Sequence, residues 1–146
     1  MATFARHATV NWSGSIMEGT GEARAGTGAF TLPVTFPRRI GDAEGTTSPE
    51  ELIAAAHATC YSMVVAAALG RKNASAQRTD VTCTVTADKT DAGIKIVSSK
   101  LELVARGLSG IDADAFAQTA KEAEQKCPVS NALRGSLAID VDVRVE

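Results

Sequence analysis

One long apolar stretch behind a strong helix start constrains this fold more than any other feature of the sequence. Ser48 suits the cap position, Pro49 suits the first helical position, and Glu51 completes a capping box with Ser48. The residues that follow are alanine-rich and apolar on nearly every side until Gly70, which predicts a helix from Pro49 to about Leu69. Such a helix is buried on several sides. In so small a chain another element must cover it, and we expect a second subunit to do so.

Polar residues inside this stretch argue against a membrane span, which needs about 20 predominantly apolar residues. The apolar run between Leu52 and Leu69 is interrupted by four polar or weakly polar side chains, those of His57, Thr59, Cys60 and Ser62. The N-terminal residues MATFARHATV lack the apolar run and the small-residue cleavage site of a signal peptide. We therefore expect a core helix, no membrane partner and a cytoplasmic location.

Alternating apolar and polar residues on both sides of the helix predict strands. They occupy residues 4–12, part of 15–25, 29–34, 81–86, 94–106 and 137–145. The pattern of the longest strand slips at Ser98 and Ser99, which predicts a β-bulge. A turn at 89–93 joins two strands, residues 38–47 are expected to form a loop, and Asp112 caps a second helix that runs to about Lys126. The order β-β-β-α-β-β-α-β indicates an α+β fold with a β-rich N-terminal part.

Length, charge and cysteine count narrow the function. The 146 residues fit a single domain, residues 1–146, and the net charge of −2 excludes the basic excess of a nucleic-acid-binding protein. Three cysteines are an odd number, no CxxC pair occurs, and two histidines would hardly complete a zinc site. We expect no metal, haem or flavin cofactor, and any cysteine chemistry should be redox or nucleophilic.

Cys60 lies in the middle of the apolar helix, where a cysteine is either a small core residue or a reactive thiol. A reactive thiol must become a thiolate, which needs a nearby cation in an apolar setting. Arg38 and Arg39 precede the helix and could supply one. Glu50 lies ten residues before Cys60, on roughly the same helical face, and could hold an arginine by a bidentate ion pair. Alternatively, Glu50 only favours the helix dipole.

The sequence favours a chemical role to different degrees for the other two cysteines and for the histidine in the helix. If Pro128 opens a short helix, Cys127 occupies its cap, where unpaired backbone N–H groups lower the pKa of a thiol. Cys127 could equally be a cap chosen for its size. Cys83 shares its face with two valines and is interpreted as a core residue. His57 could act as a base, but a lone histidine in an apolar helix is usually a satisfied core residue.

The sequence contains two long motifs, TSPEELIAAAHATC at 47–60 and CPVSNAL at 127–133, whose cysteines lie 67 residues apart. Together these motifs resemble the OsmC/Ohr family of osmotically induced proteins and organic hydroperoxide resistance proteins. The residues of these motifs are closer to those of the OsmC branch than to those of the Ohr branch. The resemblance implies an OsmC-like fold, an intertwined homodimer and active sites at the subunit interface. It implies that Cys60 is the peroxidatic cysteine, that Cys127 resolves it, that Glu50 is the family glutamate, and that the family arginine is Arg39 or its neighbour Arg38.

The expected function is therefore that of a thiol-dependent peroxidase. A Cys60 thiolate attacks a hydroperoxide, the sulfenic acid condenses with Cys127, and a dithiol reductant reduces the disulfide. Apolar neighbours of Cys60 favour an organic hydroperoxide over hydrogen peroxide; they are Leu52, Ile53, Ala56, Met63 and Val64. Two alternatives stay open. One is a thiol-based redox sensor, and the other is a small-ligand-binding dimer with structural cysteines.

Overall fold

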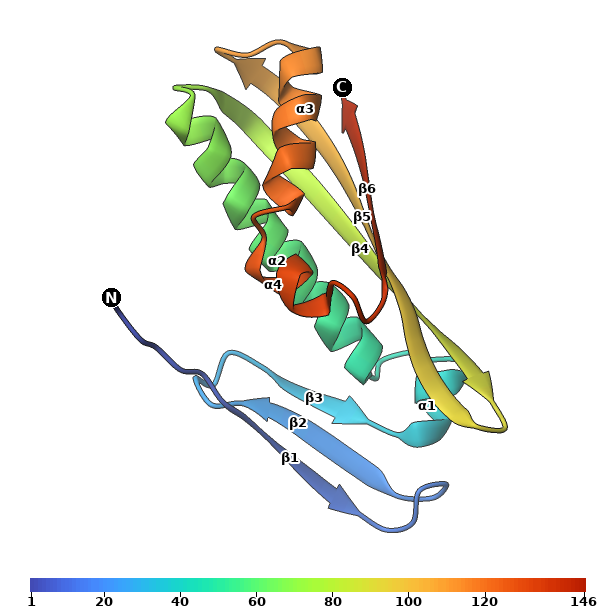
Figure 1. Ribbon diagram of the computed structural model, residues 1–146. Helices are drawn as coiled ribbons and strands as arrows, with labels where there is room; N and C mark the ends of the chain where they lie inside the picture. Colours follow the sequence, from blue (N-terminus) through green and yellow to red (C-terminus); the bar gives the residue numbers. More distant parts are fainter. The chain divides into compact units, whose positions relative to one another are not determined.

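The computed structural model describes all residues from 1 to 146 and divides them into two compact units, residues 1–49 and residues 50–146. Figure 1 shows the helices and strands of both units. Their bounds are β1 (Ala8–Ser13), β2 (Thr20–Ala25), β3 (Thr31–Val34), α1 (Phe36–Ile40), α2 (Pro49–Arg71), β4 (Ser75–Thr90), β5 (Gly93–Ser109), α3 (Ala113–Glu124), α4 (Pro128–Leu133) and β6 (Ala138–Val145). The predicted α+β class is confirmed, and the prediction of one domain over 1–146 stays a prediction.

The first unit is a three-stranded antiparallel sheet in the order β1-β2-β3, followed by α1. The turn between β1 and β2 uses Gly14 at a φ of +94°, which favours glycine. Every residue of β1 is exposed. Gly19, Ala23 and Thr47 are the buried residues of this unit, so the unit has almost no core within the single chain.

The predicted loop at 38–47 is wrong at its start, because Arg38 and Arg39 lie in α1. The Thr35 hydroxyl accepts a hydrogen bond from the backbone N–H of Arg38 at 3.3 Å, and Pro37 lies in the first turn. Both are ordinary helix-start signals, but the resulting helix has only five residues. A helix this short lacks the apolar periodicity by which sequence patterns are recognised.

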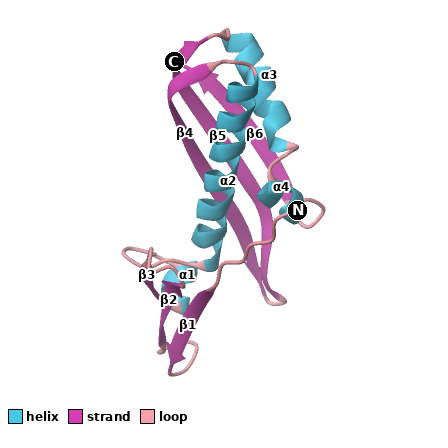
Figure 2. Cartoon of the chain, turned by 90° about the vertical axis from the view of Figure 1, so that its left-hand side faces the viewer, coloured by secondary structure: helices cyan, strands magenta, loops and turns pink.

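The second unit packs helices on one face of a three-stranded sheet in the order β4-β5-β6 (Figure 2). β5 is antiparallel to β4 and parallel to β6. The core lies between this face and α2 and α3, and its largest fully buried side chains are Tyr61, Phe116, Leu101 and Leu103. The threonines that alternate with Val81 and Cys83 along β4 are exposed, as a half-buried strand requires.

The predicted turn and bulge are both present on the β4–β5 hairpin. Thr90 pairs with Gly93, and Gly93 has a φ of +122°. Thr86 pairs with Ser98 while Ala87 pairs with Ile96, so Val97 is the extra residue of the bulge, one position before the predicted slip.

The end of α2 differs from the prediction. Gly70 lies inside the helix, which continues to Arg71, and Asn73 has the left-handed backbone conformation with a φ of 54°. Asparagine is the residue that replaces glycine most often in that role. Asp112 caps α3 as predicted, because its side chain accepts from the backbone N–H of Ala115 at 2.8 Å.

α2 is less covered within this chain than the sequence predicts. Only one stripe is buried, made up of His57, Tyr61, Val65, Ala68 and Leu69. The exposed part includes Met63, which is 67% accessible. By length and composition α2 could cross a membrane, although core helices of water-soluble proteins pass the same test. Its buried stripe packs into the core of the second unit, which identifies α2 as a core helix with one face left open.

Candidate active site

The structure brings the two predicted redox cysteines together. Cys60 lies in the middle of α2 and is partly exposed, and Cys127 lies at the start of α4 and is fully buried. Cys60 packs against the core cluster that includes Cys127, and both the Cys127 thiol and the backbone N–H of Val129 act on the pKa of the Cys60 thiol. Two sulfur atoms that are 67 positions apart in sequence therefore share one site.

Local sequence explains how Cys127 reaches this position. The residue before a proline is pushed into extended backbone, and Cys127 has a φ of −74° and a ψ of 117°. Pro128 opens α4, and the Cys127 side chain makes no capping hydrogen bond. The N–H groups of the first turn of α4 thus stay available, and that of Val129 is the one that contacts Cys60.

The second unit by itself keeps Cys60 protonated. Burial raises the pKa of the Cys60 thiol, the hydrogen bond from Val129 lowers it, and the contact with Cys127 raises it. The balance is a pKa above the ordinary value of a cysteine. The structure therefore agrees with the physical argument that a reactive thiolate here needs a cation.

The two other predicted site residues lie in different units, Arg39 in the first and Glu50 in the second. Arg39 is in α1, and Glu50 is in the first turn of α2. Arg38, the alternative to Arg39, donates from its guanidinium to the backbone oxygen of Glu44 at 2.8 Å. Because the two units are described separately, the approach of Arg39 to Cys60 and Glu50 stays a prediction.

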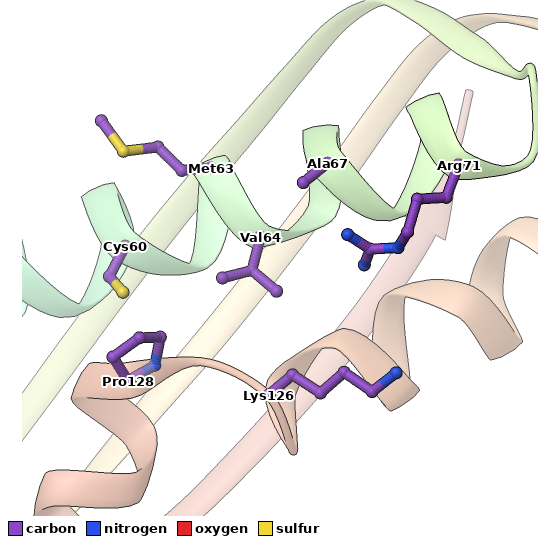
Figure 3. A pocket seen from close by; sticks show the side chains of 7 residues that line it. All are labelled: Cys60, Met63, Val64, Ala67, Arg71, Lys126 and Pro128. Atoms are coloured by element: carbon purple, nitrogen blue, oxygen red, sulfur yellow. The ribbon is translucent and has the colours of Figure 1, made fainter. Parts of the chain in front are cut away.

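A hollow of about 610 Å³ opens on Cys60 between α2 and the start of α4 (Figure 3). Of the apolar neighbours predicted for Cys60, Met63 and Val64 line it, and Leu52, Ile53 and Ala56 do not. Arg71 and Lys126 lie at the end of the hollow away from Cys60 (Figure 3). The full lining is Cys60, Met63, Val64, Ala67, Arg71, Lys126 and Pro128. The wall next to the thiol is thus apolar, and the far end is cationic.

Sequence reasoning missed a buried polar cluster beside the cysteines. His57 is fully buried, its Nδ1 lies 2.6 Å from Ser99 Oγ, and its Nε2 lies 2.6 Å from Ser130 Oγ. Ser99 Oγ also contacts Cys83 Sγ at 3.2 Å. Burial lowers the pKa of His57, the charge of Glu124 raises it, and that of Arg134 lowers it. His57 is therefore a satisfied core residue, as the sequence favoured, but its two serine partners carried no local signal.

Cys83 lies in this core as predicted. It is half-buried on β4 and packs against the core cluster. Burial raises the pKa of its thiol, and the hydrogen bond from Ser99 lowers it. No group of three or more histidine, cysteine or acidic side chains has the proximity that metal binding requires.

An ion pair holds the segment around Cys127 from both sides. Arg134, which follows α4, donates to the carboxylate of Glu124 at the end of α3 at 2.7 Å. The Glu124 side chain is only 4% exposed. Gln125 donates to the other carboxylate oxygen of Glu124 at 2.8 Å. The ion pair therefore joins the two ends of residues 124–134, a segment that contains Cys127 and α4.

Comparison with known proteins decides the family. Residues 41–142 match the family model of OsmC-like proteins. Peroxiredoxin OsmC of Escherichia coli K12 is 34% identical over 143 residues, which cover 97% of this chain and 99% of that protein. The chain belongs to the OsmC-like family. The predicted resemblance is confirmed, and the two motifs at 47–60 and 127–133 both lie within the matched residues.

Other OsmC-like proteins agree in sequence and in fold. The organic hydroperoxide resistance protein-like 2 of Staphylococcus epidermidis is 28% identical over 120 residues, covering 80% of this chain and 82% of that protein. A crystal structure of an organic hydroperoxide resistance protein OsmC from Legionella pneumophila superposes with a TM-score of 0.74 at 25% identity, over 100% of this chain and 99% of the other. The α+β architecture described above is thus the OsmC-like fold.

Proposed function

We propose that this OsmC-like protein is a thiol-dependent peroxidase that reduces organic hydroperoxides, and hydrogen peroxide more weakly. The observation that carries the proposal is the pairing of a partly exposed Cys60 with a buried Cys127 in one site. Relatives named as a peroxiredoxin and as organic hydroperoxide resistance proteins support the same activity.

The chemistry needs only the two thiols and a reductant. The Cys60 thiolate attacks one peroxide oxygen, the O–O bond breaks, and an alcohol leaves after taking up a proton. Cys60 is then a sulfenic acid. The Cys127 sulfur displaces the sulfenic oxygen, which leaves as water with the thiol proton, and the S–S bond forms. A dithiol then exchanges with this disulfide, returns both thiols to their reduced form and becomes oxidised itself.

Arg39 completes the proposed site. A guanidinium beside Cys60 would oppose the effect of burial, which raises the pKa of this thiol. Glu50 would hold the guanidinium by a bidentate ion pair, and Arg38 is the alternative cation. This assignment rests on the family pattern and on the neutral state of Cys60 in the second unit.

The substrate preference follows from the hollow. Met63, Val64 and Pro128 offer apolar surface beside the thiol, and an alkyl or aryl group on the hydroperoxide would cover it. Hydrogen peroxide has no apolar group, so it gains no binding free energy from this apolar surface. An organic hydroperoxide should therefore react with a lower KM than hydrogen peroxide.

The proposed assembly is an intertwined homodimer in the cytoplasm. Large apolar side chains that are exposed in the single chain support it, because a second copy could bury them. They occur in both units and include Val10, Trp12, Phe30, Ile40 and Met63. The nearly coreless first unit and the open face of α2 would both gain cover from a second copy.

One experiment separates the peroxidase from its rivals. The reduced protein is treated with one equivalent of cumene hydroperoxide and analysed by peptide mass spectrometry, and turnover is followed with a dithiol present. A Cys60–Cys127 disulfide together with sustained turnover is expected. A disulfide without turnover would favour a redox sensor, and unchanged thiols would favour a ligand-binding dimer with structural cysteines; either result contradicts the proposal.

A further inference from the structure

His57 joins three elements of the second unit through two short hydrogen bonds. It lies on α2, Ser99 lies on β5, and Ser130 lies on α4. All three side chains are fully buried, and both N···O distances are 2.6 Å. A buried polar side chain that lost one of these partners would keep an unsatisfied group, so the cluster holds its members firmly in place.

The directions of the hydrogen bonds follow from the contact between Ser99 and Cys83. A neutral imidazole donates from one nitrogen and accepts at the other. If His57 Nδ1–H donates to Ser99, the Ser99 hydroxyl can donate to Cys83 Sγ at 3.2 Å. His57 Nε2 then accepts from the Ser130 hydroxyl. This tautomer gives an acceptor to the imidazole proton and to both serine hydroxyl protons, and we assign it on that ground.

The cluster is connected through the backbone to both cysteines. His57 precedes Cys60 by three residues on α2, and Ser130 follows Cys127 by three residues in α4. α4 has only six residues, and no side-chain hydrogen bond from its N-cap residue, Cys127, stabilises its start. The hydrogen bond from Ser130 to His57 therefore joins the short helix that follows Cys127 to the helix that carries Cys60.

Disulfide formation is unusually sensitive to such a link. A bridge needs an S–S distance of about 2.05 Å and a Cβ–Cβ distance of about 3.5–4.5 Å, so a small shift of α4 removes Cys127 from reach. The attack of hydroperoxide on Cys60 has no such requirement, because the hollow that opens on the thiol is lined by neither His57 nor Ser130. The two steps should therefore respond differently to loss of the link.

We propose that His57 is a positioning residue for the disulfide-forming step, which acts through Ser130 to hold Cys127 against Cys60. The inference rests on the proposed function, in which Cys127 displaces the sulfenic oxygen of Cys60 as water. His57 takes no proton from either thiol in this role. Its Nε2 accepts the Ser130 hydroxyl proton throughout, and only the placement of α4 depends on it.

Ser130→Ala and Ser99→Ala form a matched pair for the test. Each removes one buried hydroxyl from the same histidine, so the two variants should lose comparable stability. Only Ser130→Ala removes the link to α4. Urea unfolding and near-UV circular dichroism establish that both variants are folded at the assay temperature.

The readout separates the two chemical steps. The reduced protein is mixed with excess cumene hydroperoxide and quenched at intervals, and mass spectrometry measures Cys60 as thiol, as sulfenic or over-oxidised forms, and as disulfide. In Ser130→Ala, loss of the Cys60 thiol should proceed at the wild-type rate. Its disulfide should form about tenfold more slowly, which is equivalent to about 1.4 kcal/mol. Over-oxidised Cys60 should accumulate in Ser130→Ala. In Ser99→Ala the proportions of disulfide and over-oxidised Cys60 should equal those of the wild type.

A second pair of variants tests the histidine itself. The amide of His57→Gln reaches about as far as Nε2 and can still accept from Ser130, while the shorter amide of His57→Asn lies near Nδ1. Faster disulfide formation in His57→Gln than in His57→Asn is expected. The inference would be overturned, and the proposed function left intact, by either of two results. One is that Ser130→Ala forms the disulfide and over-oxidised Cys60 in the same proportions as the wild type. The other is that Ser99→Ala forms the disulfide as slowly as Ser130→Ala does. A wild type without a Cys60–Cys127 disulfide would overturn the proposed function as well.

Discussion

Acid should destabilise this protein through His57, and a variant without that imidazole should lose the effect. Burial lowers the pKa of His57 in the folded state from its ordinary value of 6.5. The unfolded chain therefore takes up a proton near that value while the folded chain does not. Stability is fully present above pH 6.5 and is lost as the pH falls from there towards the lower folded-state pKa.

The size of the effect follows from proton linkage. One proton bound only by the unfolded state lowers the free energy of unfolding by about 1.4 kcal/mol per pH unit. The loss accumulates from pH 6.5 down to the lowered folded-state pKa of His57 and stops growing below it. The facing charges of Glu124 and Arg134 shift the pKa of His57 in opposite directions, and burial is the largest cause.

The assay compares urea unfolding of the wild type and His57→Gln at a series of pH values. All other titratable groups, including the exposed His7, are present in both proteins and cancel in the difference. The stability advantage of the wild type should shrink as the pH falls below 6.5. Parallel stability curves across this range would refute the argument, because they would mean that His57 binds its proton equally in both states.

Four further predictions concern the thiols and the cation. Cys60→Ser should abolish peroxidase turnover, because a serine hydroxyl is a far weaker nucleophile near neutral pH. Cys127→Ser should keep the first turnover but accumulate sulfenic or over-oxidised Cys60 in mass spectra; wild-type multiple turnover would contradict it. Cys83→Ala should retain catalysis and lose about 0.5–3 kcal/mol in urea unfolding, and a trapped disulfide of Cys83 would refute its core role. Arg39→Ala should raise the pH at which iodoacetamide alkylates Cys60, with Arg38→Ala as the control that identifies the wrong neighbour if it alone shifts the profile.

The elements that position the site could be predicted where the sequence pattern that specifies them spans only a few neighbouring residues. The start of α2 follows from Ser48, Pro49 and Glu51, and the turn at Cys127 follows from the proline beside it. The bulge at Val97 follows from a break in strand alternation. Each of these depends on neighbours within a few residues, which is the range over which a single sequence carries structural information.

The partners of His57 were not predictable for the same reason. Ser99 and Ser130 lie 42 and 73 residues from it, on a strand and on a short helix whose own patterns say nothing about histidine. Their contact exists only because β5 and α4 pack against the same face of α2. The open face of α2 and the nearly coreless first unit are likewise properties of tertiary packing, and alternation in β1 could not show that neither face is covered.

The reactivity of Cys60 has to come from outside the unit that contains both thiols. Within residues 50–146, burial and Cys127 keep the pKa of Cys60 high, and one N–H of α4 opposes them. His57 cannot act as the base, because each of its nitrogens is already bonded to a buried serine and burial lowers its own pKa. Arg71, which lines the hollow, follows Cys60 by eleven positions, a rise of about 16 Å along the helix axis. We therefore expect the activating guanidinium to come from the first unit or from a second copy, and the alkylation profile of Arg39→Ala, rather than any change near α4, tests how the nucleophile is made.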